Sequence, residues 1–202
     1  MISIAAFIPA FAASPFADAT TPWHLVANLE ALVDAQIDHL PTDQYRLDGR
    51  VAVHRDAAVE PGAVLKGPLI IGPGCFIATG AYLRGGCWLE RDCILGPGAE
   101  LKTSLMFAGS KLAHFNFVGD SIIGRDVNLE AGSIVCNYRN ERTDKEIQVR
   151  LQGTLHKTGV QKFGALLGDH TRLGANAVVA PGGLLPMGSI VRRASLLDQE
   201  SA

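Results

Sequence analysis

A period of six residues runs through most of this chain. From Ala57 the sequence divides into the blocks AAVEPG, AVLKGP, LIIGPG, CFIATG, AYLRGG, CWLERD, CILGPG and AELKTS. The first position of each block is small except at Leu69, and the third is always aliphatic: Val59, Leu65, Ile71, Ile77, Leu83, Leu89, Leu95 and Leu101. Neither an α-helix nor a single alternating strand has this period. The pattern predicts a solenoid of short parallel strands, with aliphatic side chains inside and Gly and Pro at the corners.

The repeat changes phase twice along the chain. It continues in a new register at Phe117, Ile123, Leu129 and Val135, and it resumes at Leu167, Leu173, Val179, Leu185 and Val191. We therefore expect insertions near 106–116 and 139–161, of which the second is rich in charged residues. In repeat proteins such excursions gather on one face and often carry the site. The predicted organisation is an arm and helix over 1–50, the solenoid over 51–193 and a tail over 194–202.

The segment before the solenoid has two parts. Residues 1–17 are apolar and rich in alanine, but no Lys or Arg precedes Arg46, so the basic region of a signal peptide is missing. We expect an arm that packs on the body of a cytoplasmic protein, with secretion as the alternative. Thr21 and Pro22 precede WHLVANLEALVDAQIDHL, whose apolar residues follow helical spacing. This predicts one amphipathic helix with Thr21 as its N-cap and Pro22 in its first turn.

Composition excludes several classes of function. Apolar residues make up 48% of the chain and aromatic residues only 6%, which suits a narrow interior filled by aliphatic side chains. The net charge of −2 argues against a nucleic-acid partner, and no stretch is long and apolar enough to span a membrane. The cysteines form no C-x-x-C motif and the six histidines form no close ligand pair, so no metal is predicted. Cys75 and Cys93, one coil apart, are expected to be small buried hydrophobes rather than a disulfide.

The blocks resemble the left-handed parallel β-helix acyltransferases, in which three blocks make one coil. Four ordered segments narrow the resemblance: ELKTS (100–104), KLAHFNFVGDSIIG (111–124), VNLEAGSIVCNY (127–138) and QKFGALLGD (161–169). They are similar to the C-terminal acetyltransferase domain of bifunctional glucosamine-1-phosphate acetyltransferase/uridyltransferases and to related sugar-phosphate nucleotidyltransferase-like proteins. The first 50 residues contain no Gly-rich nucleotide loop, so we expect no uridyl transfer.

This resemblance implies a fold and an activity. The implied fold is all-β, a single-stranded left-handed parallel β-helix preceded by a short helix. The implied activity is N-acetyl transfer from acetyl-CoA, used as a co-substrate, to an amino-sugar phosphate or a nucleotide-linked amino sugar. A homotrimer is implied because the sites of the family lie between neighbouring subunits. The competing hypothesis is a non-catalytic sugar-phosphate-binding or assembly module derived from the same domain.

Two residues match catalytic positions of the family. His114 is the candidate general base, because attack of a sugar amine on a thioester releases a proton and imidazole accepts protons near neutral pH. A solvated loop histidine is the simpler interpretation of the residue taken alone. Asn137 would orient the amine or polarise the thioester carbonyl, and a turn asparagine is the alternative.

Four residues match the acceptor side of the family's site, and a fifth departs from it. Arg84 and Lys102 are 18 residues apart, three blocks, so we expect them to stack on neighbouring coils. Two stacked cations favour an anion between them, and a phosphate fits that role. Lys162 and Asn128 also match acceptor positions, although an interior or turn asparagine is an equal alternative for Asn128. Phe117 stands where the family usually has tyrosine, which removes one hydroxyl from the acceptor side.

A second departure and the cofactor residues complete the resemblance. After CNY the family often continues Asp-Gly, whereas this chain has Arg139-Asn140 followed by a longer charged loop. Acetyl-CoA would lie along the later coils, against Tyr138 and the backbone of Ala175. Arg192 and Arg193 would meet its phosphates, and a basic C-terminal cap is the alternative for these two.

Overall fold

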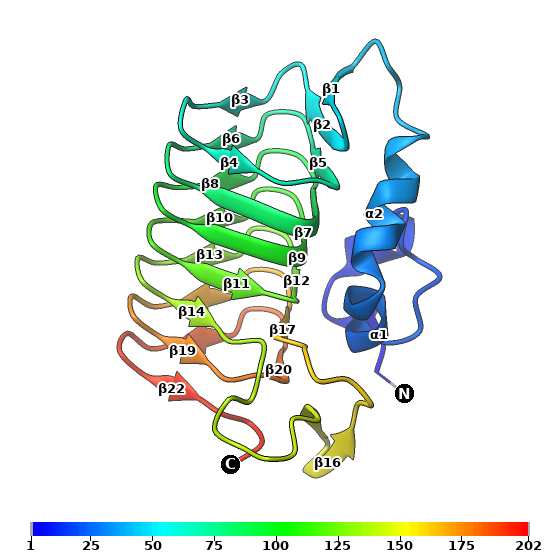
Figure 1. Cartoon of the computed structure of the whole chain (residues 1–202). Coiled ribbons are helices and arrows are strands. Elements are labelled where there is room, and N and C mark those ends of the chain that lie inside the picture. Colours follow the sequence, from blue (N-terminus) through cyan, green and yellow to red (C-terminus); the bar gives the residue numbers. More distant parts are fainter. Residues whose placement is uncertain (1, 202) are drawn as a thin grey trace.

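The structure is a computed structural model that describes residues 2–201. Short parallel strands stack in three columns, which we call faces 1, 2 and 3 (Figure 1). Face 1 contains β3 (Ala58–Val59), β6 (Phe76–Ile77), β8 (Ile94–Leu95), β10 (Lys111–Leu112), β13 (Asn128–Leu129), β18 (Arg172–Leu173) and β21 (Ile190–Val191). The expected fold class, a left-handed parallel β-helix preceded by helical structure, is confirmed.

The other two faces meet within two long strands. Both β7 (Tyr82–Leu89) and β9 (Glu100–Met106) begin on face 2 and continue on face 3. Face 2 also contains β4 (Val64–Leu65), β11 (Phe117–Gly119), β14 (Ile134–Val135), β19 (Val178–Val179) and β22 (Leu196–Leu197). Face 3 also contains β2 (Val51–His54), β5 (Leu69–Ile71), β12 (Ile122–Ile123), β17 (Ala165–Leu167) and β20 (Gly183–Leu185). Strand β1 (Tyr45–Asp48) pairs antiparallel with β2.

The aliphatic column fills the interior as predicted. Ile77, Leu83, Leu95 and Leu101 are fully buried in one continuous cluster with the small residues of the repeat. The cysteines at 75, 87 and 93 belong to this cluster as free thiols. Burial raises the pKa of the Cys87 thiol to about 11, so this side chain stays neutral and packs as a small hydrophobe.

The first phase change has a different origin from the predicted one. Strand β9 pairs with β7 at an offset of 18 residues on face 2, whereas β11 pairs with β9 at an offset of 17. At the corner between faces 2 and 3, the coil of β7 has two residues, Gly85 and Gly86. The coil of β9 has only Thr103 there, and the coil of β11 has only Asp120. The corner is one residue shorter, and no insertion lies near 106–116. As a result Val118, not Phe117, lies in the interior.

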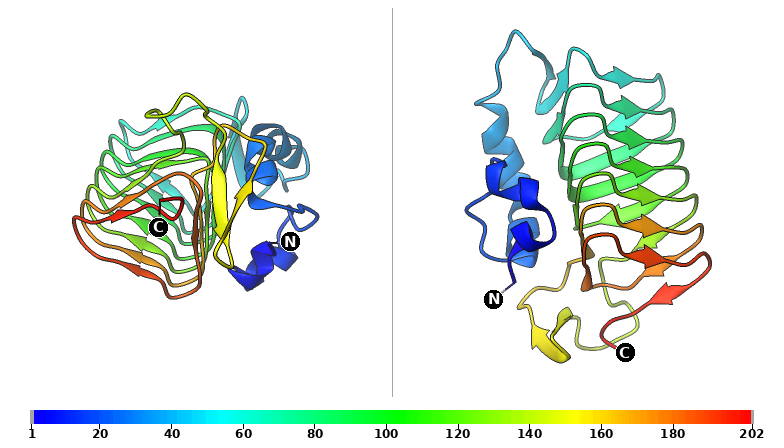
Figure 2. Two further views of the ribbon diagram at one scale, coloured as in Figure 1. Left: turned by 90° about the horizontal axis from the view of Figure 1, so that it is seen from below. Right: turned by 180° about the vertical axis from the view of Figure 1, so that it is seen from behind.

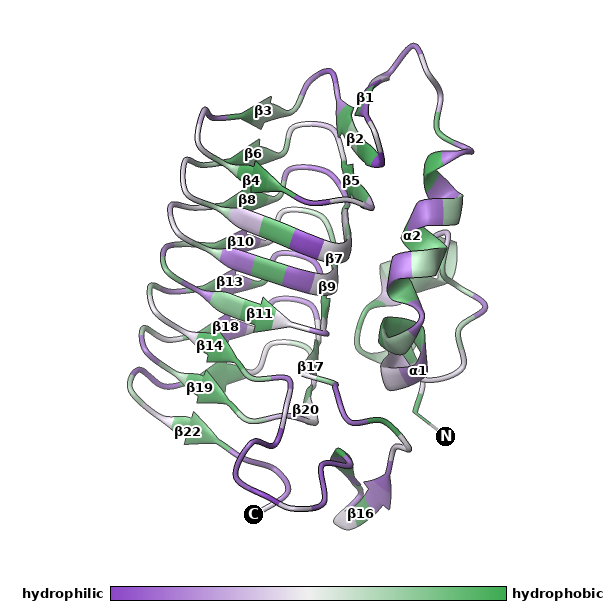
Figure 3. Ribbon diagram, in the orientation of Figure 1, coloured by the Kyte–Doolittle hydropathy of each residue, from purple (hydrophilic) through white to green (hydrophobic). Residues whose placement is uncertain are grey.

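The second predicted insertion is present. The chain leaves the solenoid after β14 and returns at β17, and between them lies an antiparallel hairpin of β15 (Gln148–Leu151) and β16 (Thr154–Lys157). The hairpin lies near the C-terminal end of the solenoid (Figure 2), and this stretch is largely hydrophilic (Figure 3). Strand β22 pairs with β19, so the last coil extends into the residues expected to form a tail.

The predicted helix is divided in two. Helix α1 (Pro22–Ala27) ends at Asn28, whose φ of −107° and ψ of 4° are not helical, and α2 (Leu29–Ile37) follows directly. The Asn28 side-chain amide donates to the carbonyl oxygen of His24 at 2.8 Å, which stabilises the break. Pro22 lies in the first turn as predicted. Thr21 occupies the N-cap position, but its hydroxyl contacts the His24 ring at 2.8 Å instead of capping the backbone.

The arm and both helices cover face 3. This face is apolar on its outer side as well, where Ile70, Leu105, Ile122 and Leu166 are buried against residues of the arm and helices. The arm adds two short 3-10 helices, η1 (Ile4–Ala6) and η2 (Pro9–Ala13). The Phe16 and Trp88 rings meet edge to face at 5.6 Å between centroids. The arm therefore packs on the body, as predicted. Among residues 2–201, no helix has the length and apolar character needed to cross a membrane.

Candidate functional site

Arg84 and Lys102 lie in one column, at the corner between faces 2 and 3. They are direct register partners on β7 and β9. Each cation, however, has its own carboxylate. Arg84 Nη2 lies 2.7 Å from Glu100 Oε1, and Lys102 Nζ lies 2.8 Å from both carboxylate oxygens of Asp120. The predicted stacking is correct, but the two charges do not require a phosphate between them.

Asp120 is the site residue that the sequence reasoning missed. Its side chain is only 7% exposed, and its carboxylate also accepts a hydrogen bond from Asn137 Nδ2. The Asp120 carbonyl accepts the amide of Gly164, where the chain returns from the insertion. Asp120 therefore connects Lys102, Asn137 and the end of the insertion. Its position 18 residues after Lys102 was an available signal.

Lys102 and Lys162 meet at one pocket of about 510 Å³. The solenoid, the helices and the end of the insertion each supply part of its lining: Lys102, Thr103 and Asp120; Val26, Ala27 and Glu30; Val160, Gln161 and Lys162. The Lys162 side chain is exposed and forms no ion pair within the described part of the chain. Lys162 is therefore the cation of this pocket whose charge is not already compensated.

His114 lies away from this pocket. It is exposed in the turn between β10 and β11, at the corner between faces 1 and 2. Asp120 directly follows β11, so His114 and the Lys102 pocket lie at opposite ends of that strand. Phe117 begins β11 and is half-buried, and its alternation with the inward-facing Val118 places its ring on the outer side of face 2.

Asn128 lies with the predicted cofactor residues rather than with Lys102. It begins β13 on face 1, in register with Arg172. A groove of about 540 Å³ runs along this part of face 1 and its corner with face 2. Its lining comprises Asn128, Glu130, Arg172, Leu173, Gly174, Ile190, Val191, Arg192 and Arg193. The groove therefore presents several arginine side chains and one carboxylate.

Glu130 links two of the predicted cofactor residues. One of its oxygens accepts the backbone amide of Ala175 at 2.8 Å, and both accept hydrogen bonds of 2.6 Å from Arg193. The hydrogen bonds from Arg193 lower the pKa of the Glu130 carboxyl. Arg192 is exposed and makes no ion pair among residues 2–201, so its charge is available to an anion.

Tyr138 is separated from Ala175 and the two arginines. It follows Asn137 at the start of the insertion, at the corner between faces 2 and 3, and Lys145 Nζ lies 5.2 Å from its ring centroid. In a single chain Tyr138 therefore belongs with the Lys102 side of the molecule.

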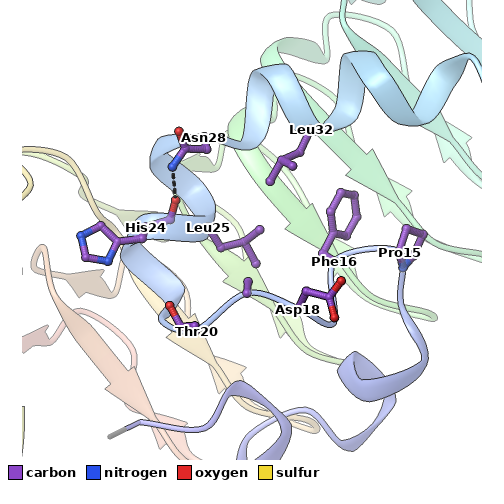
Figure 4. A pocket seen from close by; sticks show the side chains of 9 residues that line it. Pro15, Phe16, Asp18, Thr20, His24, Leu25, Asn28 and Leu32 are labelled. Atoms are coloured by element: carbon purple, nitrogen blue, oxygen red, sulfur yellow. Dashed lines mark hydrogen bonds between the residues drawn. The ribbon is translucent and has the colours of Figure 1, made fainter.

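Two further observations concern ligand binding. Within residues 2–201, no group of three or more His, Cys, Asp and Glu side chains is arranged to hold a metal ion. A pocket of about 430 Å³ lies between the arm and the helices (Figure 4), where Phe16, Leu25 and Leu32 lie near Asp18 and His24. None of the predicted site residues lines it.

Comparison with known proteins agrees with the repeat. Residues 68–103 match the family model described as bacterial transferase hexapeptide (six repeats). The chain is 34% identical over 169 residues to a bifunctional sugar-1-phosphate nucleotidylyltransferase/acetyltransferase of Sulfurisphaera tokodaii, covering 82% of this chain and 42% of that protein. It is 34% identical over 125 residues to the bifunctional protein GlmU of Methanococcus vannielii, covering 62% of this chain and 30% of that protein.

Solved structures share little sequence with the chain. A variant of AntD, an N-acyltransferase from Bacillus cereus in complex with dTDP and coenzyme A, is 12% identical with a TM-score of 0.35, covering 74% of this chain and 73% of that one. A hexapeptide transferase family protein from Anaplasma phagocytophilum is 15% identical with a TM-score of 0.26, covering 69% and 72%. Similarity this low adds nothing to the assignment.

The chain spans less than half the length of the two curated relatives described above. Three observations nevertheless agree on the repeat: the match to the family model, the 169 residues aligned with the first relative, and the stacked coils. This chain carries the hexapeptide repeat of the bacterial transferases, and it resembles the acetyltransferase region of the GlmU-type bifunctional proteins.

Proposed function

We propose that this chain transfers an acetyl group from acetyl-CoA to the amine of an amino-sugar phosphate or a nucleotide-linked amino sugar. The observation that carries the proposal is the convergence of Lys102 and Lys162 on one pocket, beside Asn137. Lys102 is compensated by Asp120, so Lys162 supplies the charge that attracts the acceptor phosphate. The names of the sequence relatives supply the reaction type and the sugar-phosphate class.

The proposed chemistry gives roles to His114, Asn137 and Arg192. The imidazole of His114 accepts a proton while the acceptor nitrogen attacks the thioester carbonyl carbon. The carbon–sulfur bond then breaks, the N-acetyl product forms, and CoA leaves as the thiol after taking up a proton. Asn137 donates to Asp120 at the acceptor corner, which supports its role in orienting the amine. The face 1 groove, with the uncompensated Arg192, would receive the phosphates of CoA.

A single chain does not bring these groups together, which supports a homotrimer. His114 and Lys102 lie at opposite ends of β11, and the arginine groove lies on face 1. We propose that the His114 corner of one copy meets the Lys102 corner of the next. Co-expression of His114→Ala and Lys102→Ala chains tests this, because mixed assemblies would regain sites with both residues intact. Activity no higher than that of either variant alone would contradict shared sites.

We place this protein in the cytoplasm. All four cysteines are free thiols, as expected in a reducing compartment that also supplies acetyl-CoA.

The decisive experiment measures CoA release with glucosamine-1-phosphate, galactosamine-1-phosphate and nucleotide-linked amino sugars. His114→Ala should lower the rate by roughly 10²–10⁴-fold, the range for a general base. Its folding should be unaffected, since the side chain is exposed in a turn. No CoA release with any acceptor, or an unchanged rate in the variant, would overturn the proposal.

A further inference from the structure

An arginine of the insertion is buried against the C-terminal segment. The Arg139 side chain is only 6% exposed. Its two terminal nitrogens donate to the two carboxylate oxygens of Asp198 at 2.7 and 2.9 Å, and Nη2 also donates to the carbonyl oxygen of Pro181 at 3.0 Å. Such a two-pronged arrangement fixes the orientation of both side chains. Residues 139 and 198 are far apart in the sequence, so this contact depends on the stacking of the last coils.

The same C-terminal segment is attached on both sides. Two further arginines of the insertion hold it, since Arg142 pairs with Glu200, and Arg150 donates to the carbonyl oxygens of Gln199 at 2.7 Å and of Glu200 at 3.0 Å. On the other side, the Gln199 amide exchanges hydrogen bonds of 2.7 and 3.0 Å with the backbone of Leu184 on β20. We call residues 198–200 the clasp.

The clasp is connected to the candidate site through the consecutive residues Arg139, Tyr138 and Asn137. Asn137 is anchored by Asp120 through its side chain, and its carbonyl oxygen accepts the amide of Phe163 at 3.1 Å. Tyr138 follows it and is 36% exposed. Arg139 comes next and is locked by Asp198. The span Asn137–Tyr138 is therefore fixed at one end by the solenoid and at the other end by the clasp.

The contact between Arg139 and Asp198 involves a position at which this chain differs from the resembled family. Arg139 and Asn140 stand where the resembled family often continues Asp-Gly. A longer charged loop follows. Without the Arg139 contact, Asn137 and Tyr138 would be attached only at the solenoid end of that loop. Arg139 supplies a second attachment, to a carboxylate from the other end of the chain.

We infer that Arg139 and Asp198 are positioning residues that hold Asn137 and Tyr138 in the geometry needed at the acceptor corner. The inference about catalysis rests on the proposed function, whereas the inference about local order does not. Asp198→Asn preserves the shape of the side chain while removing its charge. In Asp198→Asn, Arg139 keeps Glu200 Oε2 at 3.1 Å from Nη2 but loses its two-pronged partner. The pair Arg139→Gln/Asp198→Asn also removes the buried positive charge, so it guards against a loss of folding caused by an incompletely compensated arginine.

The first measurement is hydrogen exchange of residues 136–142, compared with residues 94–112 of the solenoid. Both clasp variants should exchange at least about tenfold faster at 136–142, while the solenoid segment stays unchanged. Arg50→Gln is the control, because Arg50 also pairs with carboxylates, those of Asp34 and Asp38, but lies at the N-terminal end of the solenoid. Unchanged exchange at 136–142 in both clasp variants would overturn the inference, whether or not the protein turns over acetyl-CoA.

The second measurement is a double-mutant cycle on acetyl transfer. If the clasp acts through Asn137, Asp198→Asn lowers kcat severalfold in the wild-type background but causes little further loss in Asn137→Ala. Fully additive losses would show that Asp198 does not act through Asn137. A wild-type protein inactive with every acceptor would instead refute the proposed function, and the exchange result would still decide whether the clasp orders the loop.

Discussion

The Asp120 carboxylate accepts hydrogen bonds from Lys102 Nζ at 2.8 Å to each of its oxygens. The two side chains are 7% and 15% exposed, so the pair lies at the edge of the interior. Asp120 stands at the shortened corner with a positive φ of 49°, and its carboxylate meets Lys102 of the preceding coil. The pair fixes Lys102 at the pocket and leaves Lys162 as the uncompensated cation there.

Removal of the Asp120 charge should destabilise the fold. Asp120→Asn leaves Lys102 without its counter-ion, and we expect a loss of about 3 kcal/mol in the free energy of unfolding, the lower end for a buried pair. Adding Lys102→Met should restore much of that loss, because the unpaired charge is then gone. Denaturant unfolding measures both. Asp126→Asn is the control, since Asp126 is exposed and its ion pairs should contribute no more than about 1 kcal/mol. Equal losses for the two aspartates would contradict this account.

The contact between α2 and the solenoid should be sensitive to one methyl group. A Cβ at Gly86 would lie 2.5 Å from the Cα of Glu30, whereas a Cβ at Gly49 would meet nothing within 4 Å. Both glycines have positive φ, so each alanine substitution carries a backbone cost of about 1–2 kcal/mol. Gly86→Ala should cost about 1–3 kcal/mol more than Gly49→Ala, because the helix must move. Thermal unfolding of the two variants compares them, and equal midpoints would refute the close approach.

The two arginines at the end of the solenoid should differ in their effect on acetyl-CoA binding. Arg193 is already held by Glu130, whereas Arg192 is exposed and makes no ion pair in the described residues. Arg192→Gln should raise the KM for acetyl-CoA about tenfold, the loss expected from one charge-assisted hydrogen bond of about 1.4 kcal/mol. Arg193→Gln should raise it less. A larger effect at Arg193 would mean that its pairing with Glu130 breaks when the cofactor binds.

Acid should weaken the clasp through Asp198. The hydrogen bonds from Arg139 hold the pKa of the Asp198 carboxyl well below its ordinary value of 3.8. A carboxyl with a depressed pKa in the folded state stabilises that state above its unfolded pKa, and this stability is lost as the pH falls toward the folded pKa. The free energy of unfolding should therefore decline more steeply below about pH 5 in the wild type than in Asp198→Asn. Parallel pH profiles for the two proteins would contradict the assignment.

The phase changes show how far a periodic sequence can be interpreted. In a repeat of six, the loss of one residue shifts the pattern by the same amount as the gain of five residues. The pattern after Leu101 therefore could not distinguish a shortened corner from an insertion. The structure shows the shortened corner, at Thr103 and Asp120. The same ambiguity assigned Phe117 to the interior, a position that Val118 occupies.

The helical segment shows a similar limit. The apolar spacing from Leu25 predicted helix correctly as far as Ile37, but it predicted neither the break at Asn28 nor the end of the helix before Leu40. Asn28 leaves the helical conformation because its side chain bonds to the His24 carbonyl, a local competition that hydrophobic periodicity does not register.

The sequence by itself determined the stacked coils, their aliphatic interior and the long excursion before Lys162, because each coil contacts only its neighbours and its pattern is local. Only the tertiary structure decided which charges meet. Asp120 meets Lys102 where two equally short corners stack, and Asp198 meets Arg139 from 59 residues away because the last coil returns beside the insertion. Such pairings depend on where side chains lie after the coils have stacked. A repeat pattern within the sequence does not specify these positions.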